Sequence, residues 1–271
     1  MLYCRVLLAY FILENYLKLK NYKPILTDDG SQTLFSERYQ EACHSTHGAS
    51  EETRLHYIQG CSVPDFIRSH QAINILEVGF GTGIGLKETL HATEGLGQVF
   101  YLSFEIDPEL VEYSLKGFDW KHTNLFNNSS DYLIEIPNAQ IIILIGDARS
   151  RITDLKENLT QKFDVIYQDA FSPRRNADLW TKQWFEQLAL VSQPHVKMST
   201  YSASSSIRKA MLAAGWSLKA GEKFGPKRTS TRADLSGHSD DEIIDRLKRS
   251  PAITLDDNNY QEYMNEKNSY K

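Results

Sequence analysis

Residues 73–83 read Ile-Asn-Ile-Leu-Glu-Val-Gly-Phe-Gly-Thr-Gly, and this stretch decides the fold. A short apolar run that ends at glycines is typical of a strand buried in a parallel sheet. Gly79, Gly81 and Gly83 allow the backbone to approach a ligand closely at the start of the next helix. Their spacing differs from the dinucleotide-binding pattern G-x-G-x-x-G, because no glycine stands in its last position. A tight turn without a ligand is the alternative interpretation.

The remainder of the chain alternates between strand-like and helix-like segments. Further strands are expected at Val99–Glu105, Gln140–Ile145, Phe163–Gln168, His195–Tyr201 and Trp216–Ala220. Helices are expected at Thr82–His91, Pro108–Lys116, Asp178–Val191 and Ser204–Ala214. This alternation predicts an α/β fold in which helices cover both faces of a mostly parallel sheet.

Three segments are expected along the chain. Residues 1–23 form an N-terminal extension or helix, and residues 24–235 form the main domain, which opens with a hairpin at Pro24–Ser31. Residues 236–271 are a polar, acidic tail with one short helix that begins near Ser239 and stops before Pro251. The composition after that proline favours disorder or loose docking.

The charge is distributed unevenly. The 271 residues contain 30 Lys and Arg against 35 Asp and Glu, a net charge of −5. Residues 1–170 carry 14 basic and 23 acidic side chains (−9), residues 171–235 carry 11 and 4 (+7), and residues 236–271 carry 5 and 8 (−3). The positive block predicts an anionic partner, which the net charge of the whole chain conceals.

Cysteine usage and hydropathy indicate a cytoplasmic protein. The three cysteines form no C-x-x-C pair, which fits a reducing compartment. The apolar run Val6–Leu13 is too short to span a bilayer, so no membrane partner is expected. His44 and His47 have H-x-x-H spacing but no third ligand at zinc-site spacing, so no metal is expected.

Acidic residues end three of the predicted strands. Glu77 suits the cationic sulfonium and amino groups of S-adenosylmethionine (SAM) better than a pyrophosphate. Glu105 can accept both ribose hydroxyls of a nucleoside, and Asp147 can bond the adenine amine. One such acid alone would be a solvated strand end. Together with the glycines of residues 79–83, these acids predict the cofactor site of a class I SAM-dependent methyltransferase, with a Rossmann-like sheet and an N-terminal hairpin extension.

The fourth strand ends in Asp169, and Phe171 follows two positions later. Asp169 is expected at the mouth of the cofactor site, next to the transferable methyl group. Phe171 is expected to stack on a planar acceptor base, although packing in the core is the more common use of such an aromatic residue. Both are therefore predicted as catalytic residues.

Several separated motifs resemble those of the MnmC-type tRNA (5-methylaminomethyl-2-thiouridine) methyltransferase family. They lie at residues 26–31, 35–39, 48–54, 169–181, 199–202, 207–208 and 224–228. Together they cover roughly residues 24–235. Several separated motifs in the same order as in the family are stronger evidence than any one motif. The chain departs from the family pattern at Arg175, Ala177 and Leu179, where lysine, proline and methionine are usual. These departures leave the acceptor less certain but remove no proposed catalytic group.

The resemblance implies methylation of an aminomethyl nitrogen on the wobble uridine of tRNA. The amine must first lose its proton, and Asp169 would hold and orient it. The base must also leave the anticodon stack, with Phe171, Trp180 and Tyr201 as stacking candidates. Contacts to the tRNA phosphates of the anticodon region are expected from Arg174, Arg175, Lys227 and Arg228.

Bifunctional members of the family also carry a flavin-dependent oxidase domain. A chain of 271 residues leaves no room for one, so only the methyl-transfer half is implied, with a separate FAD-dependent oxidase acting upstream. Two alternatives remain: an aminopropyltransferase similar to spermidine synthase, and a non-catalytic RNA-binding module with a degenerate nucleoside pocket.

Overall fold

The structure is a computed structural model that describes residues 19–118, 120, 122–124, 130–225 and 229–269. Nine strands form the central sheet: β4 (Ala72–Val78), β5 (Gln98–Glu105), β6 (His122–Asn124), β7 (Tyr132–Ile136), β8 (Ala139–Ile145), β9 (Phe163–Gln168), β10 (Ser192–Thr200), β11 (Ser217–Ala220) and β12 (Thr231–Asp234). A small antiparallel sheet contains β1 (Tyr22–Leu26), β2 (Gln32–Ser36) and β3 (Glu41–Ala42).

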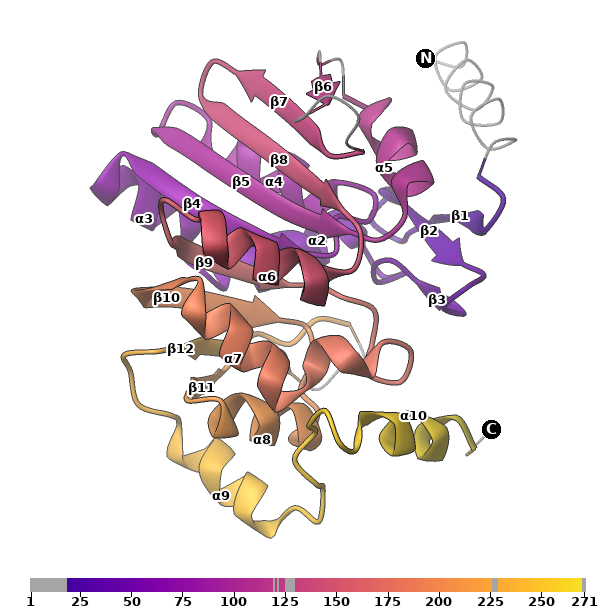
Figure 1. Ribbon diagram of the computed structural model, residues 1–271, viewed down its shortest axis with the longest axis vertical. Coiled ribbons are helices and arrows are strands. Elements are labelled where there is room, and N and C mark those ends of the chain that lie inside the picture. The colour runs from indigo at the N-terminus through magenta and orange to yellow at the C-terminus, as the bar shows by residue number, and fades with distance from the viewer. Residues whose placement is uncertain (1–18, 119, 121, 125–129, 226–228, 270–271) are drawn as a thin grey trace.

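The helices flank this sheet (Figure 1). They are α2 (Ala49–Thr53), the π-helix η1 (Arg54–Gln59), α3 (Val63–His70), α4 (Ile84–Thr93), α5 (Pro108–Leu115), α6 (Ala148–Asn158), the 3-10 turn η2 (Ala177–Trp180), α7 (Lys182–Leu190), α8 (Ser205–Ala213), α9 (Asp241–Arg249) and α10 (Tyr260–Ser269). No helix among the described residues is long and apolar enough to cross a membrane.

The strand order is β11-β12-β10-β9-β4-β5-β8-β7-β6. The five strands β4, β5, β8, β9 and β10 are parallel, whereas β12 lies antiparallel between β10 and β11. From β4 the chain first builds outward through β5 and β8 and then crosses back to β9. The order therefore reverses between β4 and β9, which is where open α/β sheets bind ligands at their carboxyl ends.

Two apolar cores lie on opposite faces of the sheet, as strand alternation requires. On β4, Leu76 and Val78 belong to one core with side chains of α6, α7, α8 and α9. Ile73 and Ile75 of the same strand belong to the other core with side chains of η1, α3, α4 and α5. The predicted α/β architecture with helices on both faces is thus confirmed.

The small sheet is docked on the carboxyl edge of the central sheet, and Figure 1 shows it beside α5. The Tyr22 hydroxyl donates to Asp107 Oδ2 at 2.8 Å, directly after β5. Glu41 Oε2 accepts from the Ser172 backbone N–H at 3.0 Å, after β9. The predicted hairpin at its start is confirmed, because β1 and β2 pair antiparallel around the Asp-Gly turn.

Three expectations on local structure were incomplete or wrong. The single helix predicted over Asp178–Val191 is divided by Thr181, whose hydroxyl caps α7 by accepting from the Trp184 N–H at 3.2 Å. Strands β6, β7 and β12 and helices α3 and α6 were not among the expected elements; β12 has only four residues and little apolar character. The segment after Pro251 is not loosely docked, since Leu255 and Tyr263 are buried in the main core.

Candidate functional site

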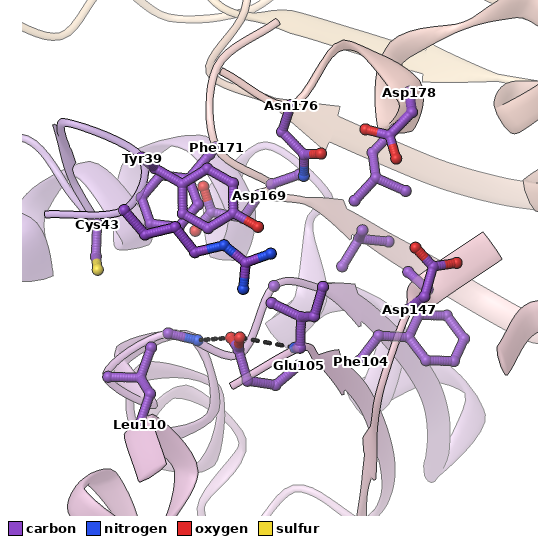
Figure 2. A pocket seen from close by; sticks show the side chains of 18 of the residues that line it. Tyr39, Cys43, Phe104, Glu105, Leu110, Asp147, Asp169, Phe171, Asn176 and Asp178 are labelled. Atoms are coloured by element: carbon purple, nitrogen blue, oxygen red, sulfur yellow. Dashed lines mark hydrogen bonds between the residues drawn. The ribbon is translucent and has the colours of Figure 1, made fainter. Parts of the chain in front are cut away.

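The strand-end cavity has a volume of about 300 Å³ and lies at the carboxyl ends of β4, β5, β8 and β9. Its lining residues are Arg38, Tyr39, Cys43, His44, Val78, Gly79, Gly81, Phe104, Glu105, Ile106, Leu110, Gly146, Asp147, Ala148, Asp169, Ala170, Phe171, Asn176, Asp178 and Leu179. Figure 2 shows Tyr39, Phe171 and Asp169 toward one end of this cavity and Asp147 and Asp178 toward the other. Its position at the reversal of the strand order matches the ligand site of an α/β sheet.

The glycine loop after β4 forms one wall of the strand-end cavity. Gly79 has a φ of +98°, and a Cβ there would lie 2.8 Å from the carbonyl oxygen of Asp169. Gly81 has a φ of +55° and faces His44. Gly83 does not line the cavity: it precedes α4 with a φ of +74°, and a Cβ there would press against Phe80 and Phe118 at 3.1 Å. Gly83 therefore has a packing role.

Glu105 lies at the floor of the strand-end cavity (Figure 2) and organises the backbone around it. Its Oε2 accepts from the Gly81 N–H at 3.0 Å, and its Oε1 accepts from the N–H groups of Ile106 and Asp107 at 2.8 and 3.0 Å. Burial raises the pKa of Glu105, and these three donors oppose that rise. The carboxylate thus couples the glycine loop to the end of β5, where a ribose was expected.

Two acids line the opposite end of the strand-end cavity. Asp147 is exposed and caps α6 by accepting from the Ser150 N–H at 2.9 Å. Asp178, which the sequence reasoning missed, has a raised pKa because of its burial and the nearby charge of Asp147. Both carboxyl groups are close enough to the cavity to accept hydrogen bonds from a base or an amine.

Glu77 lies outside the lining of the strand-end cavity, which corrects the role expected for it in the cofactor site. Its carboxyl is 2% exposed and accepts from the Ser103 hydroxyl at 2.9 Å. It occupies space at the start of α4 that only a glycine leaves open, since a Cβ on Gly85 would meet Glu77 Oε1 at 1.9 Å. Burial and the charge of Asp169 raise the pKa of Glu77 well above its ordinary value. Strand alternation explains the error, because Val78, not Glu77, faces the cavity.

A second space of about 300 Å³, the adjoining cavity, borders the first. Its lining residues are Glu41, Ala42, Cys43, His44, Ser45, Thr46, His47, Glu52, Asp169, Ala170, Phe171, Tyr201 and Phe224. The two cavities share Cys43, His44, Asp169, Ala170 and Phe171. A ligand in one cavity would therefore meet a ligand in the other beside Asp169.

Asp169 is held by contacts to two separate parts of the chain. Its backbone N–H donates to the Val78 carbonyl at 3.1 Å, which extends the pairing of β9 with β4. Its Oδ1 accepts from the Tyr57 hydroxyl at 2.6 Å. Asp169 lines both cavities, and its position at the mouth of a cofactor pocket stays a prediction.

The predicted aromatic stacking residues divide into two groups. Phe171 lines both cavities and stacks on Tyr39, with ring centroids 4.3 Å apart and planes 19° apart. Tyr201 lines the adjoining cavity and donates to the Ala170 carbonyl at 2.8 Å. Trp180 is fully buried, and its Nε1–H donates to the Phe171 carbonyl at 2.8 Å. Stacking of a base on Trp180 is therefore excluded. This residue instead stabilises the loop that contains Phe171 through its buried hydrogen bond.

The predicted phosphate-binding side chains have different environments. Arg174 is exposed, and Arg175 is partly buried with its Nη1–H donating to Asn268 Oδ1 at 3.5 Å. Lys227 and Arg228 lie outside the described residues. Among the described residues, no group of three or more His, Cys, Asp and Glu side chains is placed to hold a metal ion.

His44 belongs to both cavities and hydrogen-bonds through Nδ1 to the Thr33 hydroxyl at 2.9 Å. Burial lowers its pKa to about 4. Since an unfolded histidine has a pKa of about 6.5, protons bind the unfolded chain first as the pH falls below that value. This side chain should therefore lower the free energy of unfolding by roughly 2 kcal/mol between pH 7 and pH 5.

Urea unfolding of His44→Gln at these two pH values tests this expectation. The variant should lose less stability than the wild type on acidification, whereas His91→Gln, which replaces an exposed histidine on α4, should behave like the wild type. Equal losses for the wild type and His44→Gln would contradict the expected burial effect.

Comparison with known proteins agrees with this architecture. A family model described as S-adenosyl-L-methionine-dependent methyltransferase matches residues 119–236. With the sheet order and the strand-end cavity, this match defines the chain as an α/β SAM-dependent methyltransferase, and SAM as its cofactor.

Its relatives narrow the class further. The chain is 27% identical over 250 residues to the tRNA 5-methylaminomethyl-2-thiouridine biosynthesis bifunctional protein MnmC of Ralstonia nicotianae, covering 84% of this chain and 36% of that protein. MnmC2 from Aquifex aeolicus is 26% identical, with a TM-score of 0.70 over 88% of this chain and 79% of that one. The resemblance to the MnmC-type family is thereby confirmed, for a chain that spans about a third of its bifunctional relatives.

A third relative shares the fold alone. Spermidine synthase from Thermotoga maritima is 14% identical, with a TM-score of 0.51 over 89% of this chain.

Several residues that line the two cavities or bond to their lining were not predicted as site residues. They are Arg38, Tyr39, Glu41, Cys43, His44, Glu52, Tyr57, Asn176, Asp178 and Phe224. Most come from the N-terminal sheet and the helices that follow it. The family motifs at residues 35–39 and 48–54 could have indicated them. These motifs lie outside the glycine loop and the strand ends, so cofactor binding does not explain them.

Proposed function

We propose that the protein transfers a methyl group from SAM to the aminomethyl nitrogen of 5-aminomethyl-(2-thio)uridine at the tRNA wobble position, giving 5-methylaminomethyl-(2-thio)uridine. The observation that carries this proposal is the meeting of two cavities at Asp169, one with the features of a nucleoside site and one lined by acidic and aromatic side chains. The names of the bifunctional relatives support this choice of acceptor. Such a substrate also implies the cytoplasm as the place of action.

The residues of the strand-end cavity fit SAM. Gly79 and Gly81 line the cavity with bare backbone that a ligand can approach closely, and a cavity of this size is within the range of small-molecule sites. Glu105 would hold the ribose, and Asp147 or Asp178 the adenine amine. Bound there, SAM supplies a methyl group on a cationic sulfur.

The adjoining cavity suits an alkylamine attached to a planar base. Glu41, Glu52 and Asp169 provide carboxyl groups that attract an ammonium, and Glu52 is only 7% exposed. Phe171, Tyr201 and Phe224 supply aromatic surface for the base. Enzymes that flip a base stack it on aromatic side chains, and this stacking offsets part of the energy of removing the base from the helix.

Asp169 would hold the amine with its lone pair toward the strand-end cavity. An ammonium has no lone pair, so its proton must pass to water or to a carboxylate of the adjoining cavity before the nitrogen can accept a methyl group. A carboxylate is a weak base, and its main contributions are orientation and charge stabilisation. The reaction therefore depends on where this carboxylate points.

The proposed tRNA face begins beside this site. Arg174 is exposed on the loop that follows Phe171. Arg174→Ala should weaken tRNA binding several-fold and reduce the slope of log K against log salt by about one, because one phosphate contact is lost. Filter binding at several salt concentrations measures both quantities.

The matched control is Arg68→Ala, which removes an exposed arginine from the last turn of α3, close to the start of β4 at the opposite edge of the sheet. This variant should bind tRNA like the wild type. An unchanged slope for Arg174→Ala would place its side chain outside the tRNA interface.

The decisive experiment incubates the purified chain with labelled SAM and tRNA that carries 5-aminomethyluridine at the wobble position, followed by nucleoside mass spectrometry. We expect 5-methylaminomethyluridine, and no labelling of tRNA that carries plain uridine there. In cells that lack the protein, the aminomethyl nucleoside should accumulate if a separate oxidase supplies it. Absence of product would overturn the proposal, and parallel reactions of putrescine with decarboxylated SAM test the aminopropyltransferase alternative.

A further inference from the structure

Tyr57 makes a direct contact to the carboxylate at the centre of the site. Its hydroxyl donates to Asp169 Oδ1 at 2.6 Å, although the two residues are 112 positions apart in the sequence. The Tyr57 side chain is 2% exposed, and it is not part of the lining of either cavity. Its contact to Asp169 is therefore made by a side chain outside both cavity linings.

The backbone around Tyr57 is fixed independently of Asp169. Tyr57 lies in η1, a π-helical segment, and such segments are rare and are often found at functional sites. The Ser199 hydroxyl on β10 donates to the carbonyl of His56 at 2.5 Å. The Tyr57 ring packs against Tyr167 on β9, with centroids 5.2 Å apart. The hydroxyl therefore has a defined position relative to the central sheet.

The backbone of Asp169 is fixed as well, by its N–H bond to Val78 and by the close approach of Gly79 to its carbonyl. These contacts set the Cα position but leave the side-chain torsions open. The bond from Tyr57 acts at the carboxylate itself, so it restricts these torsions. A charge-assisted hydrogen bond of this length is among the stronger interactions available to a carboxylate.

We propose that Tyr57 is a positioning residue, whose hydroxyl holds the Asp169 carboxylate in the one orientation that serves the acceptor amine. This inference rests on the proposed function for its kinetic consequence. Tyr57 remains a donor throughout, because burial and the charge of Asp169 raise its pKa well above the ordinary value. It therefore orients Asp169 and transfers no proton.

The test is Tyr57→Phe in the full chain, with Tyr167→Phe as the matched control. Each variant removes one buried tyrosine hydroxyl from the same cluster, but that of Tyr167 bonds the Thr89 hydroxyl at 3.1 Å instead of Asp169. We expect Tyr57→Phe to lower kcat on the order of tenfold. The KM for tRNA and the Kd for SAM should change by less than about twofold, and Tyr167→Phe should keep kcat within about twofold. Equal slowing of both variants, or no slowing of Tyr57→Phe, would overturn the inference.

Crystal structures of the three proteins with S-adenosylhomocysteine provide a readout that does not depend on the acceptor. The Asp169 carboxylate should have one orientation in the wild type and in Tyr167→Phe, and a different or divided orientation in Tyr57→Phe. A single unchanged orientation in all three would refute the positioning role. If the wild type fails to methylate aminomethyluridine, the proposed function fails, while these structures still test the inference about Tyr57.

Discussion

Asp169→Asn is expected to slow methyl transfer by about a thousandfold, because a preorganised charge beside the reacting nitrogen is lost. Asparagine keeps the size of the side chain and an oxygen for the Tyr57 hydroxyl, but it loses the negative charge that holds the amine. The Kd for SAM should stay within about threefold of the wild-type value, because most of the strand-end cavity is unchanged. Single-turnover kinetics and calorimetric titration of SAM separate the two effects.

The control for this substitution is Asp65→Asn, which removes an exposed carboxylate on α3 that is paired with Arg68. It should turn over at the wild-type rate. Retention of more than about a tenth of the wild-type rate by Asp169→Asn would remove Asp169 from the reaction, because a preorganised group that stabilises charge at the reacting atoms contributes at least about a hundredfold.

Gly81→Arg is expected to weaken SAM binding by at least about a hundredfold. Gly81 lines the strand-end cavity, has a φ of +55°, and donates its N–H to Glu105. A long side chain there would occupy the space of the ligand, and its Cβ would strain the backbone of the loop. Isothermal titration with SAM measures the loss.

The variant Gly95→Arg separates the effect of backbone strain from the effect of a side chain in the ligand space. Gly95 has a φ of +70° and open space where a Cβ would lie, in the loop between α4 and β5 that is away from the cavity. This variant should lose stability to a similar extent yet bind SAM normally. Comparable loss of SAM binding in both variants would mean that global destabilisation, not the position of Gly81, causes the effect.

The cofactor half of the fold was predictable because its signals are local. Each parallel strand is a continuous apolar run, and the glycines and acids that follow β4, β5, β8 and β9 stand directly at the strand ends. The period of a strand explains the error at Glu77. Glu77 precedes the glycines in sequence, but it points to the face opposite Val78 and away from the cavity.

The acceptor side was less predictable because it depends on contacts between distant segments. Nothing near Tyr57 in the sequence indicates that its hydroxyl meets Asp169. Trp180 has a side chain that could stack on a base. Its complete burial follows from the packing of its loop on the core, which the sequence does not show. Sequence identifies residues with suitable chemistry, but their exposure is decided by tertiary packing.

The docking of the small N-terminal sheet has a consequence for how the protein folds. Glu41 on β3 bonds the Ser172 N–H, and the adjoining cavity draws its walls from both Glu41 and Phe224. Contacts between such distant positions require the closure of long loops. These contacts form late, because the chain loses conformational entropy on loop closure before the contacts stabilise it. During refolding, secondary structure should therefore recover before the ability to bind an acceptor, so that enzymatic competence marks the last step of assembly.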